Sequence, residues 1–298
     1  MQQFVEATPG IRLWTEQRGP LDAPPLLLIM GAQASGLGWP EPLVDALATR
    51  HRVIRYDHRD TGRSPWAFAQ HPYRIADLAQ DAIAVLDGLG IGRAHIVGMS
   101  LGGMLAQMAL ADHPDRLLSA TLISTCALST RPYTRPDGTE VPAADLPGVS
   151  PAVLDLWARP VEDHGLEAEL DRRTEHWRIL AGDQLPFDAE HFRTLERRII
   201  EHTGRHTTNS AHGSADDSGM LRTGELAANR IPALSLAAPA DPVFPPPHAE
   251  HLAQVIGNTR LVEIPGMGHA LPPAALPRLA TAILAHTGAT APSRPPAA

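Results

Sequence analysis

The feature of the sequence that most constrains its fold is one serine placed between a short apolar run and a helix-like segment. Residues 94–97 have the pattern of the end of a buried strand, and residues 101–112 that of a helix ending before Pro114. The turn between them contains Gly98-Met99-Ser100-Leu101-Gly102, which fits the G-x-S-x-G pattern of a nucleophile elbow. A chain of this size contains the bare pattern by chance in roughly one case in ten. The flanking strand and helix are therefore the stronger evidence for a nucleophile elbow.

The two glycines of this pattern have a steric purpose. A strand that turns directly into a helix forces the residue at the turn into a strained backbone conformation, and larger residues two positions away would collide. Gly98 and Gly102 avoid that collision, so we expect the Ser100 hydroxyl at the carboxyl edge of a sheet. The alternative is that Ser100 and its glycines only form a tight turn between a strand and a helix.

Short apolar strands alternate with helices on both sides of Ser100. The expected strands cover residues 4–6, 11–16, 25–30, 52–56, 94–97, 117–124, 231–238 and 259–264, and the expected helices cover residues 41–49, 75–86, 101–112 and 274–286. The run over residues 25–30 is apolar without interruption, as in a strand that is buried on both faces. This alternation predicts an α/β fold with a mostly parallel sheet flanked by helices.

The alternation stops between residues 127 and 229. This stretch begins with a proline-rich segment, continues with helical patterns near residues 151–158, 162–180 and 188–202, and ends in a run rich in Gly, Ser and Asp over residues 207–219. We interpret it as an inserted helical cap, with residues 207–219 as a mobile surface loop. The predicted core then comprises residues 1–126 and 230–288, and residues 289–298 form a disordered tail.

Two further strand ends supply the partners that a serine nucleophile needs. A serine hydroxyl reacts only when a base takes its proton, and that base needs a third group to orient it and stabilise its charge. Asp241 follows one expected strand and His269 follows the next, so the chain order is Ser, Asp, His. Carboxyl ends of parallel strands meet at one edge, and we therefore predict a triad of Ser100, Asp241 and His269. Alternatively, Asp241 before Pro242 is a turn former and His269 a structural histidine.

Acyl transfer also needs amide donors for the oxyanion and contacts for the substrate. The backbone amide of Leu101, at the start of the serine helix, and that of Ala32, in the glycine-rich loop after residues 25–30, are the candidate donors. The candidate substrate contacts are Gly31, Met99, Trp157, Trp177 and Phe187. The alternative for the three aromatic residues is that they fill the small core of the cap.

Composition excludes several other classes of protein. The net charge is −8, all basic charge is on arginine, and no arginine cluster suggests a nucleic-acid partner. We find no metal-ligand spacing and no phosphate-binding loop, so no metal and no cofactor is expected. With one cysteine, no basic apolar leader and no run of membrane-spanning length, we expect a cytoplasmic protein, a monomer or weak homodimer, without membrane contact.

At this point the motifs resemble a known family. The elbow at residues 98–102, Asp-His-Arg-Asp-Thr-Gly-Arg-Ser at 57–64 and Pro-Gly-Met-Gly-His at 265–269 resemble the α/β-hydrolase family, and the likeness extends over nearly the whole chain. Within that family the chain resembles the methylesterases of anthracycline tailoring. The cap segments Trp-Arg-Ile-Leu at 177–180 and Pro-Phe-Asp at 186–188 matter most for this narrower likeness, because generic hydrolases share only the core motifs.

The resemblance implies an activity and also leaves other activities open. It implies a serine carboxylic ester hydrolase that acts through an acyl-enzyme on a methyl ester of a bulky aromatic polyketide, with the triad and oxyanion residues predicted above. Met30 departs from the usual His-Gly oxyanion motif, and Ala32 stands where these methylesterases are expected to have glycine. The alternatives are a general short-chain esterase, a lactonase or a hydrolase of carbon-carbon bonds, and a non-catalytic protein that binds a small apolar ligand. Epoxide hydrolases and haloalkane dehalogenases are disfavoured because they have Asp at the position of Ser100.

Overall fold

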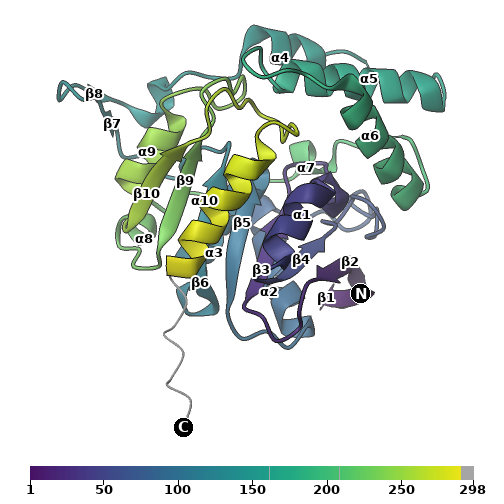
Figure 1. Cartoon of the computed structure of the whole chain (residues 1–298), viewed down its shortest axis with the longest axis horizontal. Helices are drawn as coiled ribbons and strands as arrows, with labels where there is room; N and C mark the ends of the chain where they lie inside the picture. The colour runs from purple at the N-terminus through teal and green to yellow at the C-terminus, as the bar shows by residue number, and fades with distance from the viewer. Residues whose placement is uncertain (161, 208, 290–298) are drawn as a thin grey trace.

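The computed structural model describes residues 1–160, 162–207 and 209–289. Within these residues, eight strands form one sheet in the order β1-β2-β4-β3-β5-β6-β9-β10 (Figure 1). The strands are β1 (Gln2–Thr8), β2 (Ile11–Arg18), β3 (Pro25–Ile29), β4 (Arg52–Tyr56), β5 (Ala94–Met99), β6 (Leu117–Ile123), β9 (Ala233–Ala237) and β10 (Thr259–Glu263). β2 pairs antiparallel with β1 and β4, and all pairs from β4 to β10 are parallel. The predicted mostly parallel sheet is confirmed.

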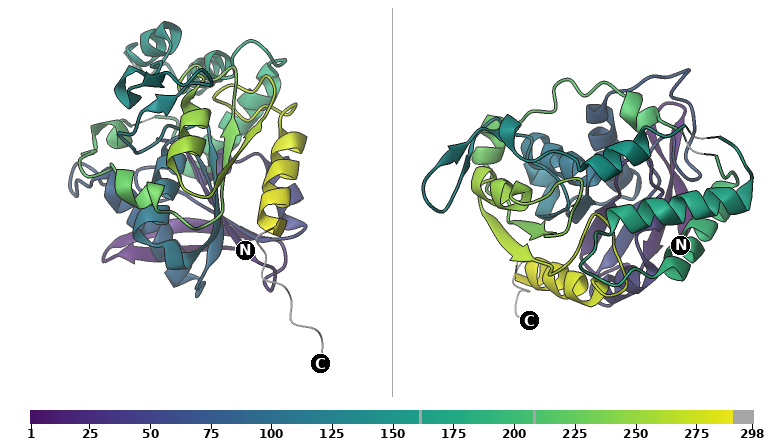
Figure 2. Two further views of the ribbon diagram at one scale, coloured as in Figure 1. Left: turned by 90° about the vertical axis from the view of Figure 1, so that its left-hand side faces the viewer. Right: turned by 90° about the horizontal axis from the view of Figure 1, so that it is seen from above.

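Helices cover both faces of this sheet (Figures 1 and 2). The helices on one face are α1 (Glu41–Ala48) and α10 (Leu276–Ala289), and those on the other are α2 (Ile75–Gly88), α3 (Leu101–Asp112), α8 (Thr223–Ala227) and α9 (His248–Val255). Each face has its own apolar cluster, because β3 and β5 direct alternate side chains to opposite sides. The predicted tail, residues 289–298, lies outside the described residues except for Ala289, which ends α10.

Most of the segment between β6 and β9 lies over one edge of the sheet (Figure 1), whereas its last helix, α8, packs beside α3 and α9. The elements before α8 are β7 (Tyr133–Thr134), β8 (Glu140–Val141), α4 (Pro151–Trp157), α5 (Leu166–Leu180), α6 (Ala189–Thr203) and α7 (Ala211–Ser214). α4, α5 and α6 correspond to the three helical patterns in the sequence, whereas the hairpin of β7 and β8 was not expected. Seen from above in Figure 2, α5 crosses over the sheet. The division of the chain into core and cap at residues 127 and 229 stays a prediction.

The prediction of a mobile loop over residues 207–219 is wrong for part of that run. Ala211 and His212 are each only 4% exposed. Both ring nitrogens of His212 are hydrogen-bonded, Nδ1 to the Gln33 amide and Nε2 to the Arg59 carbonyl, each at 2.9 Å. The polar composition of the run indicated a solvated loop, but one buried imidazole with two backbone partners fixes it to the core.

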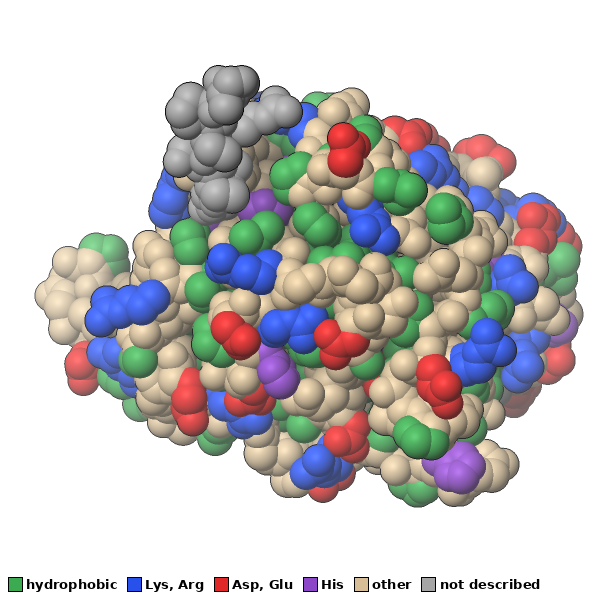
Figure 3. Space-filling view, turned by 90° about the horizontal axis from the view of Figure 1, so that it is seen from below, with side chains coloured by type: hydrophobic (Ala, Val, Ile, Leu, Met, Phe, Trp, Pro, Cys, Tyr) green, Lys and Arg blue, Asp and Glu red, His purple; other side chains and the backbone are tan. Residues whose placement is uncertain are grey.

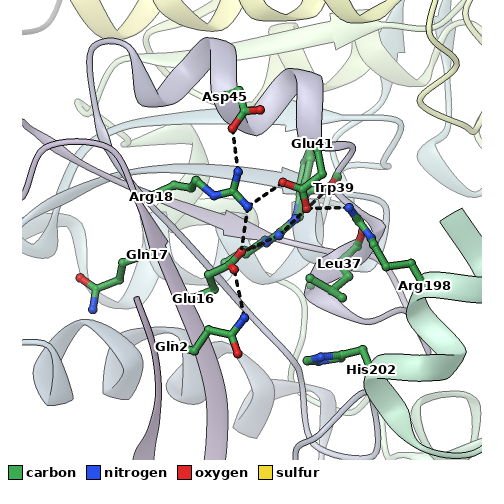
Figure 4. A network of polar contacts seen from close by, with 12 residues as sticks. Gln2, Glu16, Gln17, Arg18, Leu37, Trp39, Glu41, Asp45, Arg198 and His202 are labelled. Atoms are coloured by element: carbon green, nitrogen blue, oxygen red, sulfur yellow. Dashed lines mark hydrogen bonds and ion pairs between the residues drawn. The ribbon is translucent and has the colours of Figure 1, made fainter.

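Helix α6 is tied to the core by a network of charged side chains (Figure 4). Arg198 donates to Glu41 Oε1 at 2.7 Å and to the Leu37 carbonyl at 2.9 Å. Glu41 is shared with two core arginines, Arg55 at 2.6 Å and Arg18 at 2.8 Å. Partly buried ion pairs of this kind add little net stability, but they favour one docking geometry. The network therefore fixes where α6 lies on the loop after β3.

The outer surface agrees with the charge pattern of the sequence. On the face opposite the cap, basic and acidic side chains are interspersed (Figure 3). In the described part of the chain, no helix is long and apolar enough to cross a membrane.

Several buried histidines make the fold sensitive to acid. Burial first, and then the charge of His212, lower the pKa of His58 from 6.5 to about 4; burial and the charge of His51 lower that of His95 to about 3. Below pH 6.5 the unfolded chain binds protons at these rings, whereas the folded protein keeps them neutral. Stability that is present above pH 6.5 is therefore lost as the pH falls toward 4.

We expect one variant to isolate this effect. His95 is 1% exposed, and its Nδ1 lies 2.8 Å from Ser119 Oγ. Between pH 6.5 and 4, acid lowers the free energy of unfolding of both proteins. We expect the slope of this loss to be smaller in His95→Gln than in wild type, with a difference of about 1.4 kcal/mol per pH unit. Urea unfolding at a series of pH values measures this slope separately from any constant loss of stability. An identical slope in both proteins would contradict the prediction.

Candidate active site

Ser100 lies at the sharp turn between β5 and α3. Its backbone has φ 55° and ψ −122°, a region that residues with side chains rarely adopt. A Cβ at Gly98 would lie 2.1 Å from the Gly102 carbonyl oxygen, and one at Gly102 would lie 2.1 Å from the Ile29 carbonyl oxygen. The turn therefore requires glycine at both places, as the elbow pattern predicts. Such strain persists only where the surroundings impose it, and here it directs the serine away from the sheet.

Asp241 and His269 meet after the ends of β9 and β10. Nδ1 of His269 donates to Asp241 Oδ2 at 2.9 Å, with Oδ1 at 3.1 Å. Asp241 Oδ1 also accepts from the amides of Val243 at 2.8 Å and Phe244 at 2.9 Å. Burial opposes ionisation of Asp241, but the charge of His269, the bond from its ring and these two amides outweigh it and lower the pKa of the carboxyl. Asp241 is thus an ionised orienting group, and Nε2 of His269 is left for another partner.

The link from Ser100 to His269 is not formed in this structure. Within the described residues, the Ser100 hydroxyl makes no hydrogen bond with His269 or with any other group. Hydrogen bonds between a nucleophile and its base are often long before substrate binds and tighten in the complex. The structure joins two of the three predicted residues, and the catalytic role of all three stays a prediction.

The cap helix α5 supports the loop that carries His269. The His269 amide donates to the Leu180 carbonyl at 2.7 Å. A Cβ at Gly268 would lie 2.3 Å from the Ala181 carbonyl oxygen, so only glycine fits this contact. Phe244 packs beside the ring of His269, with 5.7 Å between ring centroids. The orientation of the imidazole is therefore set by both the core and the cap.

The two predicted oxyanion donors belong to segments that adjoin Ser100. Leu101 is the first residue of α3, where backbone amides have no partner within the helix and the helix dipole favours negative charge. Ala32 lies in the loop after β3. A Cβ at Gly31 would lie 3.2 Å from Ser100 Cβ, so this loop lies directly against the nucleophile. Gly31 is thus placed beside the nucleophile, although its role in substrate binding stays a prediction.

The other candidate substrate residues differ in their surroundings. Met99 is 4% exposed and belongs to the apolar cluster on the side of α1 and α10. Trp177 donates its indole N–H to Glu196 Oε1 at 2.6 Å and stacks on Phe192. Phe187 stacks on the same ring with 5.0 Å between centroids. Both rings pack against an apolar cluster that joins the cap to the core through Trp14, Leu37 and Ala270.

Trp157 is the cap aromatic with the most open position. It is 51% exposed at the end of α4, and its indole N–H donates to His176 Nε2 at 3.3 Å. Burial lowers the pKa of His176 to about 4, with smaller contributions from the charges of Arg172 and His269. His176 therefore accepts this bond in its neutral form. A contact between this pair and substrate stays a prediction.

Sequence reasoning missed three histidines near the site, two of which bond directly to the loop after β3. His58 Nε2 donates to the Met30 carbonyl at 2.9 Å, and His212 accepts from the Gln33 amide. His202 on α6 donates to Asp57 Oδ2 at 2.7 Å. His58 stands in the motif at residues 57–64, which was the only signal available. The other two lie in the cap, far from this loop in sequence.

The described residues form two cavities that Ser100 does not line. One of about 200 Å³ is on the cap and is lined by Pro160, Glu162, His164, Ala168, Glu169 and Arg172. The other, about 40 Å³, lies between the loop after β3 and α6, and its lining includes Gln33, Asp60 and Thr203. Neither is lined by a residue of the predicted triad, and we assign no function to them.

The sheet order, the elbow and the Asp–His pair define a class of protein, and a family comparison agrees. Residues 24–272 match the family model of the alpha/beta hydrolase fold, and the chain belongs to that family. The esterase RhEst1 from Rhodococcus sp. ECU1013 has a similar structure, with a TM-score of 0.73, 20% identity and coverage of 97% of this chain and 99% of that one. This likeness shows the fold alone.

Two curated relatives are similar over nearly the whole chain. Rhodomycin D methylesterase DauP from Streptomyces sp. (strain C5) is 43% identical over 286 residues, covering 94% of this chain and 96% of that protein. Rhodomycin D methylesterase DnrP from Streptomyces peucetius is 44% identical over 288 residues, with the same coverage of 94% and 96%. The predicted resemblance to anthracycline methylesterases is confirmed, and the likeness includes the cap.

Proposed function

We propose that this protein is a serine carboxylic ester hydrolase that cleaves the methyl ester of a bulky aromatic polyketide of the anthracycline type. The observation that carries the proposal is the pairing of His269 with buried Asp241 at the carboxyl edge of the sheet, with Ser100 on a strained elbow at the same edge. Similarity to two rhodomycin D methylesterases over 94% of the chain supports the substrate class.

The proposed acylation step uses all three residues of the predicted triad. Nε2 of His269 takes the hydroxyl proton of Ser100 while Oγ bonds to the ester carbonyl carbon, and the carbonyl π electrons move to the oxygen. Asp241 stabilises the imidazolium that forms. As the tetrahedral intermediate collapses, the bond to the methoxy group breaks and His269 gives its proton to that oxygen. Methanol leaves, and an ester between Ser100 and the acyl group remains.

Deacylation repeats these roles with water. Water gives a proton to Nε2 of His269 and its oxygen attacks the acyl carbon; Ser100 then leaves and regains the proton. The amides of Leu101 and Ala32 would stabilise the oxyanion in both steps, where an amide donor contributes roughly a hundredfold to a thousandfold in kcat. Each proton is passed on within the cycle, so the proposed reaction needs water and no cofactor.

The substrate class is tested by competing esters. We expect kcat/KM for an anthracycline methyl ester to exceed that for p-nitrophenyl acetate and for a simple lactone, with methanol as the released alcohol. Liquid chromatography with mass detection follows the acid and the methanol. Turnover of the small esters alone would retain a serine esterase and reject the polyketide. Failure of Ser100 to react with a fluorophosphonate probe in the folded protein would instead favour a non-catalytic binding protein.

A further inference from the structure

The loop that holds the second proposed oxyanion donor is anchored by two buried histidines. His58 is fully buried, and its Nε2 donates to the Met30 carbonyl at 2.9 Å. His212 is 4% exposed, and its Nδ1 accepts from the Gln33 amide at 2.9 Å. Only Gly31 and Ala32 lie between these anchors. The position of the Ala32 amide is therefore restrained from both sides.

The two bonds of His212 require one tautomer. The Gln33 amide can only donate, so Nδ1 must carry a lone pair, while Nε2 must carry the proton that it donates to the Arg59 carbonyl at 2.9 Å. An imidazolium would direct an N–H at another N–H. Burial lowers the pKa of His212, against the carbonyl of Arg59 and the charge of Asp60, and keeps the ring neutral.

The backbone at Gln33 shows why such a restraint is needed. Gln33 has φ 58°, a left-handed conformation that is uncommon for residues other than glycine. Strained conformations persist where surrounding bonds hold them in place. The bond from its amide to His212 is such a restraint, and the cap supplies it across 179 residues of sequence. Without this bond, the loop beside Ser100 would be free to relax.

We propose that His212 is a positioning residue for the oxyanion hole, which fixes the Gln33 amide and through it the amide of Ala32. This inference rests on the proposed function, because it concerns the same ester-cleaving site. The Ala32 amide bonds most strongly to an oxygen that becomes charged in the transition state. Loss of the restraint should therefore lower kcat and leave KM nearly unchanged.

Two variants of His212 separate its bond to the Gln33 amide from its bond to the Arg59 carbonyl. In His212→Asn, Oδ1 takes the place of Nδ1 and still accepts from Gln33, while the bond to Arg59 is lost. In His212→Gln, Nε2 takes the place of the ring Nε2 and still donates to Arg59, while the bond to Gln33 is lost. We expect kcat for p-nitrophenyl acetate to fall by about tenfold to a hundredfold in the Gln variant and by no more than about threefold in the Asn variant.

The controls distinguish the outcomes. Equal losses of kcat in both variants at similar unfolding temperatures, or a loss that lies in KM, would overturn the role of His212. If neither variant folds, the wild-type ring is followed by nitrogen NMR before and after a phosphonate is attached to Ser100. The His212 Nδ1 resonance should shift when the phosphonyl oxygen occupies the hole, and no shift would overturn the proposal. Wild-type protein that neither cleaves esters nor reacts with the phosphonate would reject the proposed function itself.

Discussion

Ser100→Ala is expected to lose turnover of every ester by about ten-thousandfold to a millionfold. The alanine keeps the Cβ and leaves the strained turn at φ 55° unchanged, so the structure around it should persist. What is lost is the oxygen that would bond to the ester carbonyl. The remaining activity would come from the oxyanion amides and from binding, which leave only direct attack by water. Initial rates with an anthracycline methyl ester and with p-nitrophenyl acetate measure the loss.

Two control measurements show that Ser100→Ala is folded and still binds its substrate. Its unfolding temperature should match that of the wild type, and it should still bind the anthracycline ester by fluorescence titration. A folded Ser100→Ala protein with a rate within tenfold of wild type would show that another nucleophile acts.

Asp241→Asn should reduce kcat by about ten-thousandfold without a comparable change in KM. The amide oxygen can still accept from the amides of Val243 and Phe244, which now bond to Oδ1. Its NH₂ group, however, would donate to Nδ1 of His269. That places the imidazole proton on Nε2, where a lone pair is needed to take the proton of Ser100. The base is thereby held in the wrong tautomer.

Asp22→Asn is the matched control, because Asp22 is exposed and precedes the amino end of β3, whereas the proposed site lies at the carboxyl ends of the strands. It undergoes the same chemical change and should keep wild-type kcat. If Asp241→Asn also kept wild-type kcat while folded, the Asp–His pair would be structural and the base would lie elsewhere.

The core of the site could be predicted from sequence because its parts are local. The elbow at Ser100 needs two glycines within five residues, and each of Asp241 and His269 follows its own strand. Parallel pairing of β9 with β10 then brings the two residues together. Short-range patterns together with one rule of sheet topology were sufficient to predict the elbow and the pairing of Asp241 with His269, while the catalytic role of the three residues stays a prediction.

The support around the site could not be predicted, because it depends on contacts between distant segments. His212 reaches Gln33 across 179 residues, and His202 reaches Asp57 across 145 residues. In sequence, His212 stands in a polar run that is typical of an exposed loop. Trp177 and Phe187 gave a similar difficulty, since an aromatic residue of a cap can line a pocket or stack on Phe192 as both do here. Only the fold distinguishes these arrangements.

The most direct test of the proposal is the hydrolysis of an anthracycline methyl ester in water labelled with heavy oxygen. We expect the acid product to carry the label in its carboxylate and the methanol to carry none, because the bond between acyl carbon and methoxy oxygen is the one that breaks. Ser100→Ala should release neither product at a comparable rate. Label in the methanol, or an ester left intact by folded wild-type protein, would contradict the account.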